Sequence, residues 1–231
     1  MLPPSVLTYK PIFLGLMEVS LLNEKVELLP QKALWFKASK LILIADLHFG
    51  KISHFRKYGI PVPTRANDKN TELLINLINK TTPERVVFLG DLFHSHYNEE
   101  WEVVGQIRKH FSACSFELVP GNHDILSALQ YERHNMIVYP RELRVGNIIL
   151  THEPLTTVPE GLYNLSGHLH PGVRLRGTGK QSMTLPCFYF GKQQGILPAF
   201  GSFTGLARVN PKKEERIFVI ANDKIIPYPD A

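Results

Sequence analysis

The chain has 231 residues, a length that suits one large domain with a substantial apolar core or two small ones, and we predict a single domain over residues 1–231. Its 44% hydrophobic and 20% charged residues are ordinary for a globular protein and exclude a disordered or fibrous chain. The formal net charge of +5 admits an anionic partner such as nucleic acid but does not require one.

Three features bear on the cellular compartment. The apolar run near the start of the chain is short, Gly15 and Glu18 interrupt it, and only Lys10 precedes it, so a signal peptide is a poor interpretation. No stretch approaches the roughly 18–20 apolar residues of a membrane span. Cys114 and Cys187 form neither a spaced metal pair nor a disulfide framework. We therefore expect reduced thiols in a cytoplasmic protein that has no contact with a membrane.

Five short runs of β-branched or aromatic residues each end in a polar loop. In chain order they are LILIADLH (41–48), RVVFLGD (85–91), FELVPGNHD (116–124), NIILTHE (147–153) and LYNLSGHLH (162–170). Four or five consecutive apolar residues without alternation are typical of strands buried on both faces.

Helical patterns separate the first three of these runs, over residues 70–80 and 98–111, each with apolar residues at helical intervals. Segments 187–190, 207–209 and 216–228 look like consecutive antiparallel strands, and Asn222 and Asp223 suit a turn. Strands that alternate with helices, followed by a strand-rich tail, predict an α/β fold that carries two sheets.

The polar residues at the five strand ends have the chemistry of metal ligands. In open α/β sheets, ligands bind at the carboxyl ends of the strands, so these loops should converge on one face. Taken singly, such an Asp is more often a helix cap or turn residue, and such a His a hydrogen-bonded core residue. Their conjunction at five strand ends favours a metal site. The candidate ligands are Asp46, His48, Asp91, Asn122, His152, His168 and His170.

Seven ligands are too many for one tetrahedral ion and suit two ions that share a carboxylate. Asp91, central in the order and preceded by Gly90, is the natural bridge. We expect a hydroxide that bridges the two ions to attack phosphorus. His123, next to Asn122, can give a proton to the leaving oxygen, and Asp124 would orient His123.

Five segments resemble the motif set of the calcineurin-like metallophosphoesterase superfamily: DLH (46–48), GDLFH (90–94), GNHD (121–124), THE (151–153) and GHLH (167–170). The resemblance implies a four-layer αββα sandwich of two mixed sheets, with a dinuclear metal site at one end. It also implies two ligand sets that share one carboxylate. One set is Asp46, His48, Asp91 and His170, and the other is Asp91, Asn122, His152 and His168.

Over nearly the whole chain, the sequence is similar to the bacterial ligase-associated DNA damage response phosphoesterases. The similar segments are DLHFGK (46–51), FRKYGIPVP (55–63), GDLFHS (90–95), GHLHPGVRL (167–175), LPCFYF (185–190) and LPAFGSFTG (197–205). This similarity implies a manganese-dependent phosphodiesterase or endonuclease that acts on DNA in repair, together with a DNA ligase, a helicase and a nuclease. The ligand types by themselves leave Mn, Mg, Fe and Zn open.

Several other residues are candidates for contact with the substrate. His94 and Arg56 could bind phosphate, although His94 also suits a partly exposed loop. Arg174, Arg176 and Lys180 could form a basic rim at the site, or simply a solvated strand edge. The aromatic side chains at positions 200 and 203 could stack on bases, but burial in a sheet is the more common outcome.

Two other functions compete with DNA cleavage. A phosphatase or pyrophosphatase that acts on a small nucleotide or lipid precursor would use the same metal motifs. Such an enzyme should carry a capping element over the metals, and no large insertion separates the motifs, so the compact spacing favours a polymer. A non-catalytic module with a structural metal is the other alternative, and the presence of both His123 and Asp124 argues against it.

Overall fold

The computed structural model describes residues 9–11, 17–49, 65–93, 97, 99–177, 181–202, 204–210 and 212–228. Two of the predicted substrate contacts, Arg56 and His94, lie outside these residues. In the described ranges, no helix is both long and apolar enough to cross a membrane.

The first sheet has eight strands in chain order, antiparallel from β1 to β5 and parallel from β5 to β8. Its strands are β1 (Tyr9–Pro11), β2 (Met17–Leu21), β3 (Glu24–Leu29), β4 (Ala33–Phe36), β5 (Leu41–Ala45), β6 (Arg85–Leu89), β7 (Ser115–Val119) and β8 (Met136–Val138). The predicted central strands are β5, β6 and β7, and their apolar residues are buried on both faces. Sequence reasoning missed β1 to β4.

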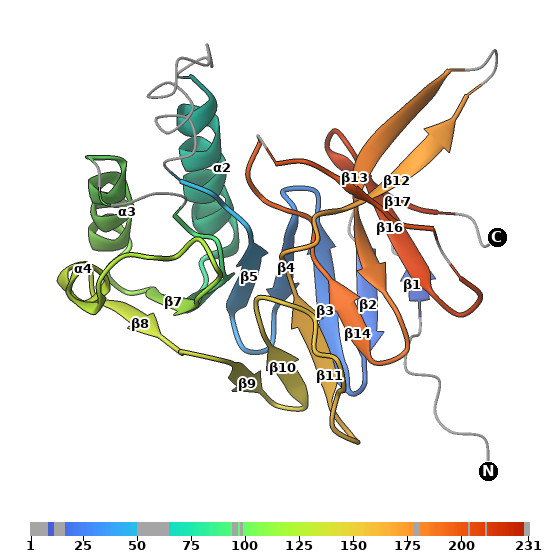
Figure 1. Ribbon diagram of the computed structural model, residues 1–231, viewed down its shortest axis with the longest axis horizontal. Helices are drawn as coiled ribbons and strands as arrows, with labels where there is room; N and C mark the ends of the chain where they lie inside the picture. The colour runs from blue at the N-terminus through green and yellow to red at the C-terminus, as the bar shows by residue number, and fades with distance from the viewer. Residues whose placement is uncertain are drawn as a thin grey trace.

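The described helices are α2 (Arg65–Thr81), α3 (Glu99–His110) and α4 (Ala128–Arg133), and all three lie on one side of the first sheet (Figure 1). The expected apolar stripes cause this packing: Leu74 and Leu77 of α2 and Trp101 of α3 are buried in one cluster with Phe88 of β6. Both predicted helices are confirmed.

The second sheet is also mixed. Its strands are β9 (Leu143–Val145), β10 (Ile148–Leu150), β11 (Tyr163–Ser166), β12 (Pro171–Arg176), β13 (Ser182–Phe190), β14 (Gln194–Ile196), β15 (Ala207–Arg208), β16 (Arg216–Ala221) and β17 (Lys224–Pro227). β10, β11 and β14 run parallel. β13, β16 and β17 form the antiparallel tail, with the predicted turn at Asn222 and Asp223.

One expectation about this tail is wrong. Segment 207–209 does not continue the antiparallel series, because β15 pairs in parallel with β12. The reason is the path of the chain after β14. The backbone N–H groups of Phe200 and Gly201 donate to the carbonyl groups of Ala45 and Asp46, so this segment crosses to the first sheet. The chain then enters β15 from the same end as β12.

The two sheets face each other across a shared apolar core. Leu43 and Leu89 of the first sheet are buried in the same cluster as Leu150, Leu165 and Phe190 of the second. The predicted α/β class with two mixed sheets is therefore confirmed. Of the two helical layers of a four-layer αββα sandwich, the described residues provide the one outside the first sheet (Figure 1).

Candidate metal centre

The candidate ligands meet where the carboxyl ends of the two sheets come together. Asp46, Asp91 and Asn122 follow β5, β6 and β7, whereas His152 and His168 follow β10 and β11. The backbone N–H of His168 donates to Oδ2 of Asp46 at 2.9 Å, which joins the two sheets at this edge. Because these neighbouring strands run parallel in each sheet, their carboxyl ends lie side by side and bring all seven candidate ligands to one region, as the strand-end pattern predicts.

The first group consists of Asp46, His48 and His170, each of which offers a ligand atom within 4.8 Å of the other two. Nε2 of His170 lies 3.5 Å from Oδ1 of Asp46. Asp46 is fully buried and His48 is 5% exposed, so the carboxylate lies at the floor of the site.

The second group consists of Asp91, His152 and His168, with the same 4.8 Å limit between ligand atoms. Nε2 of His152 lies 3.0 Å from Nδ1 of His168 and 3.2 Å from Oδ1 of Asn122, which places the exposed Asn122 amide at the mouth. Nδ1 of His152 is 3.0 Å from the Leu89 carbonyl oxygen. Because a carbonyl oxygen only accepts, Nδ1 carries a proton, and Nε2 is the ring nitrogen that faces this group.

Asp91 faces both groups with different oxygens. Its Oδ2 lies 3.7 Å from Nε2 of His48, and its Oδ1 lies 3.6 Å from Nε2 of His152. The side chain is buried, and the backbone N–H of His123 donates to Oδ1 at 3.1 Å. One carboxylate thus stands between two triads, which is the arrangement that a shared ligand requires.

The side chains fit bound cations. Oδ1 of Asp46 and Nε2 of His170 are buried and have no hydrogen-bond partner among the described residues. A buried carboxylate oxygen without a partner costs several kcal/mol unless a cation compensates it. Ligand atoms about 2.1 Å from one ion stand roughly 3.0–3.4 Å apart. The separations of 3.5 Å between Asp46 and His170 and 3.0 Å between His152 and His168 are close to this range. Carboxylate, imidazole and amide donors suit a first-row divalent ion.

Backbone conformation is unusual at the same residues. Asp46, His48, Asp91, His168 and His170 all have positive φ, between 48° and 66°. They are five of the twelve non-glycine residues with positive φ in the described part of the chain. Each such residue costs on the order of 1–3 kcal/mol, and such strain clusters at functional sites. The fold therefore tolerates strain in order to aim these side chains inward.

Gly121 lets the loop after β7 lie directly against two candidate ligands. A Cβ at this position would stand 2.4 Å from Oδ1 of Asp91 and 2.8 Å from Cε1 of His152. The neighbouring backbone N of Asp91 would be 2.6 Å away, so the clash involves main chain as well as side chains. The absence of a side chain at Gly121 is thus a condition for the observed geometry.

We expect Gly121→Ala to weaken metal binding about 10- to 100-fold, the range for residues that support metal ligands. Calorimetric titration with Mn²⁺ measures the affinity. The matched control is Gly205→Ala, because no heavy atom lies within 4 Å of a Cβ placed at Gly205. Equal affinities in the two variants would contradict the packing role of Gly121.

His123 and Asp124 lie beside the metal groups. The His123 ring is partly buried, and its centroid is 5.8 Å from that of His48. The Asp124 carboxylate accepts hydrogen bonds from the backbone N–H groups of Gly121, at 2.9 Å, and Phe93, at 3.0 Å. Asp124 thereby ties the loop after β7 to the loop after β6, a role that sequence reasoning did not foresee. Its predicted role in orienting His123 stays a prediction.

The environment of Asp124 changes its acidity. Burial raises the pKa of this carboxyl group to about 6, and the nearby charge of Asp91 also raises it. The two backbone hydrogen bonds act in the opposite direction and lower the pKa. The group is therefore a far weaker acid than an exposed aspartic acid.

The remaining predicted contacts have different positions. Phe200 is buried at 1% exposure, so it belongs to the core and does not stack on bases, and Phe203 lies outside the described residues. Arg174 and Arg176 are exposed on β12, which follows His170 directly, whereas Lys180 lies outside the described residues.

Sequence reasoning missed the buried Asn70, whose Oδ1 accepts a hydrogen bond from Ser202 at 2.7 Å. That bond links α2 to the segment after β14, a contact that no local pattern in the sequence indicates.

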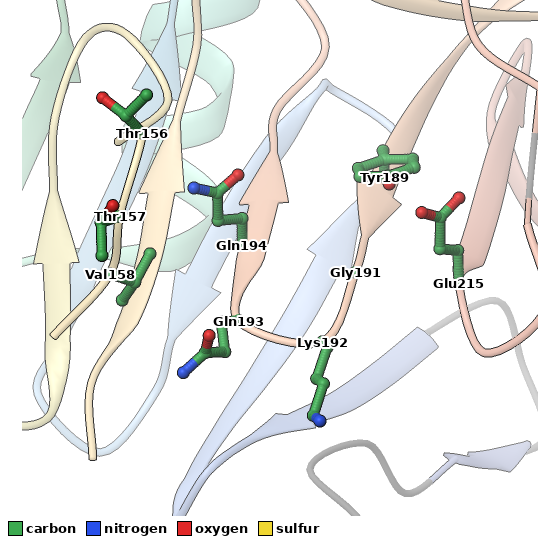
Figure 2. A pocket seen from close by; sticks show the side chains of 9 residues that line it. All are labelled: Thr156, Thr157, Val158, Tyr189, Gly191, Lys192, Gln193, Gln194 and Glu215. Carbon is green, nitrogen blue, oxygen red and sulfur yellow. The ribbon is translucent and has the colours of Figure 1, made fainter. Parts of the chain in front are cut away.

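A separate pocket opens at the other end of the second sheet (Figure 2). Its wall includes Lys192 and Gln193 from the turn between β13 and β14, Gln194 at the start of β14, and Thr156 and Thr157 from the loop after His152. Gln194 pairs with Asn164 at the start of β11, whereas His168 follows the end of that strand. The pocket is therefore distinct from the metal centre.

Two comparisons with known proteins relate this chain to metal-dependent phosphoesterases. The family model described as calcineurin-like phosphoesterase matches residues 39–218. Among solved structures, the crystal structure of nuclease MPE from Pseudomonas putida is similar, with a TM-score of 0.74 and 25% sequence identity. That similarity covers 96% of this chain and 100% of the nuclease chain. No curated protein matches the sequence.

Two facing mixed sheets with paired His and Asp groups at their carboxyl ends define a metal-dependent hydrolase of phosphate esters. The match over residues 39–218 spans all seven candidate ligands. The chain belongs to the calcineurin-like phosphoesterase family.

Proposed function

We propose that the protein is a phosphodiesterase or endonuclease that cleaves DNA during repair and uses two divalent ions, with manganese as the working metal. The observation that carries this proposal is the pair of His and Asp groups on either side of Asp91, in a chain similar over nearly its whole length to a nuclease. The similarity of this sequence to the ligase-associated phosphoesterases supports manganese as the metal. It also supports a functional association with a DNA ligase, a helicase and a nuclease.

The residues divide into two ligand sets that share Asp91. Asp46, His48, Asp91 and His170 would hold one ion, and Asp91, Asn122, His152 and His168 the other. When bound, such a pair of ions activates water and stabilises charge on the phosphoryl oxygens. The neutral amide of Asn122 suits the mouth of the site, because it offers an oxygen without adding negative charge beside the phosphate.

The proton transfer is assigned to His123. As the bond from phosphorus to the water oxygen forms, the bond from phosphorus to the leaving oxygen breaks, and the His123 ring donates its proton to that oxygen. The proton of the water passes to solvent, and His123 is reprotonated from solvent. His123 is partly buried beside His48, so it borders the metal groups and still faces solvent.

A panel of substrates tests the proposal. The protein is incubated with Mn²⁺ and, in parallel, with bis-p-nitrophenyl phosphate, p-nitrophenyl phosphate, and single-stranded and double-stranded DNA. We expect cleavage of the diester and of DNA, with complete loss on chelation of the metal. Hydrolysis of the monoester alone would overturn the proposal in favour of a phosphatase that acts on small molecules.

A further inference from the structure

We propose that an arginine face beside the metal centre binds the phosphate backbone of the substrate strand outside the cleavage position. Arg174 and Arg176 of β12 and Arg208 of β15 define this face, and all three are exposed. The inference rests on the proposed function and deepens it, because it says which residues hold the part of the strand that is not being cleaved.

Strand register puts the three arginines on one side of the sheet. Arg174 and Arg176 are two residues apart in β12, so their side chains point the same way. Gly172 shares that side, and it pairs in parallel with Arg208 of β15. Paired residues project to the same face of a sheet, so Arg208 joins the two arginines of β12.

The opposite side of these strands is occupied by the core. Val173 is buried in an apolar cluster against which Leu175, Leu185 and Val209 pack. The arginines therefore cannot turn inward, and the residues of β13 that pair with them are small. Arg174 pairs with Thr184, Arg176 pairs with Ser182, and Arg174 donates a 2.6 Å hydrogen bond to the Ser182 hydroxyl. The face is open, and one of its guanidinium groups is held in place.

The arginine face starts at the metal centre. β12 begins directly after His170, and the backbone N–H of Ala207 donates to the carbonyl of His170 at 2.9 Å. At about 3.3 Å per residue, Arg176 lies roughly 20 Å along the strand from His170. The β12–β13 hairpin projects beyond the rest of the second sheet (Figure 1). A strand bound along it would extend over several nucleotides from the metals.

Charge in this part of the sequence is of one sign. Residues 161–213 contain no Asp or Glu, but they contain seven Lys and Arg residues. Outside this segment, acidic residues outnumber Lys and Arg, so the net positive charge of the chain comes from this segment. The segment that carries the arginines therefore supplies no carboxylate of its own to neutralise them, and exposed guanidinium groups of this kind bind phosphate. A small diester would reach the metals without touching the arginines.

The test replaces all three arginines with glutamine, as R174Q/R176Q/R208Q. The control, K25Q/K80Q/K192Q, removes the same charge from exposed lysines on β3, on α2 and in the turn between β13 and β14. For each protein, kcat/KM is measured with Mn²⁺ on a single-stranded oligonucleotide and on bis-p-nitrophenyl phosphate. Affinity for the labelled oligonucleotide is measured by fluorescence anisotropy in a His123→Ala background, over a series of salt concentrations.

We expect the arginine variant to lose about 10- to 100-fold in oligonucleotide affinity and kcat/KM, and to keep its activity on bis-p-nitrophenyl phosphate. The slope of log affinity against log salt should fall by roughly 2, since each contact with a single strand contributes about 0.7. Unchanged oligonucleotide affinity and slope, or an equal loss in the lysine control, would overturn the proposal that the arginine face binds the substrate strand. Loss of binding confined to the arginine variant, in a protein that hydrolyses no diester, would support the face and overturn only the proposed function.

Discussion

Asp91→Asn lowers the affinity for both ions at once and reduces phosphodiester turnover by about 10³-fold or more. The reason is that Oδ1 and Oδ2 of Asp91 face different groups of candidate ligands, 3.6 Å from His152 and 3.7 Å from His48. The substitution removes a negative charge shared by both groups, and a loss of about 4 kcal/mol in transition-state stabilisation corresponds to this factor. Metal content and titration with Mn²⁺ measure the effect.

Asp223→Asn is the matched control for this substitution, because Asp223 lies exposed in the turn between β16 and β17. It makes the same chemical change and should leave metal content and turnover unaltered. If Asp91→Asn loses one equivalent of metal and keeps the other at its original affinity, Asp91 is not a shared ligand.

His123→Ala reduces kcat by about 10²- to 10⁴-fold, the usual contribution of a positioned acid or base, and leaves bound metal unchanged. The backbone N–H of His123 donates to Oδ1 of Asp91 and so helps to hold that carboxylate in place. Alanine retains that N–H, so the ligands should keep their positions. The loss should be largest for substrates with poor leaving groups, because these most need a proton. A series of aryl phosphodiesters with different leaving groups measures the trend.

His110→Ala is the control for the loss of an imidazole, since His110 is exposed at the end of α3. Loss of metal from the His123 variant would indicate that His123 is a metal ligand. Turnover equal to that of the His110 variant would show that His123 takes no part in the reaction. A drop in kcat that is the same for good and poor leaving groups would also be inconsistent with proton donation.

The sequence by itself predicted the strands that carry the candidate site. β5 and β6 were evident because buried parallel strands need apolar residues on both faces. The antiparallel strands before them were harder, because β2 is short and alternates between buried and half-buried residues. A short alternating pattern carries less information than a continuous apolar run.

The residue types of the candidate site were also visible in the sequence, because Asp, Asn and His recur together at five strand ends. Its packing was not visible. Nothing local indicates that Gly121 lies against Asp91, or that the two oxygens of Asp124 accept backbone hydrogen bonds from Gly121 and Phe93. These contacts depend on how loops from neighbouring strands fit together, which residue types do not specify.

The amino-acid sequence thus determined which chemical groups stand at each strand end and the excess of basic residues over 161–213. Only the tertiary structure decided the rest. It joined His168 to Asp46 across 122 residues of sequence, and it turned β15 parallel to β12, so that Arg208 shares a face with Arg174. The physical reason is that composition and periodicity act over a few residues, whereas register and the pairing of distant strands depend on the packing of the whole core.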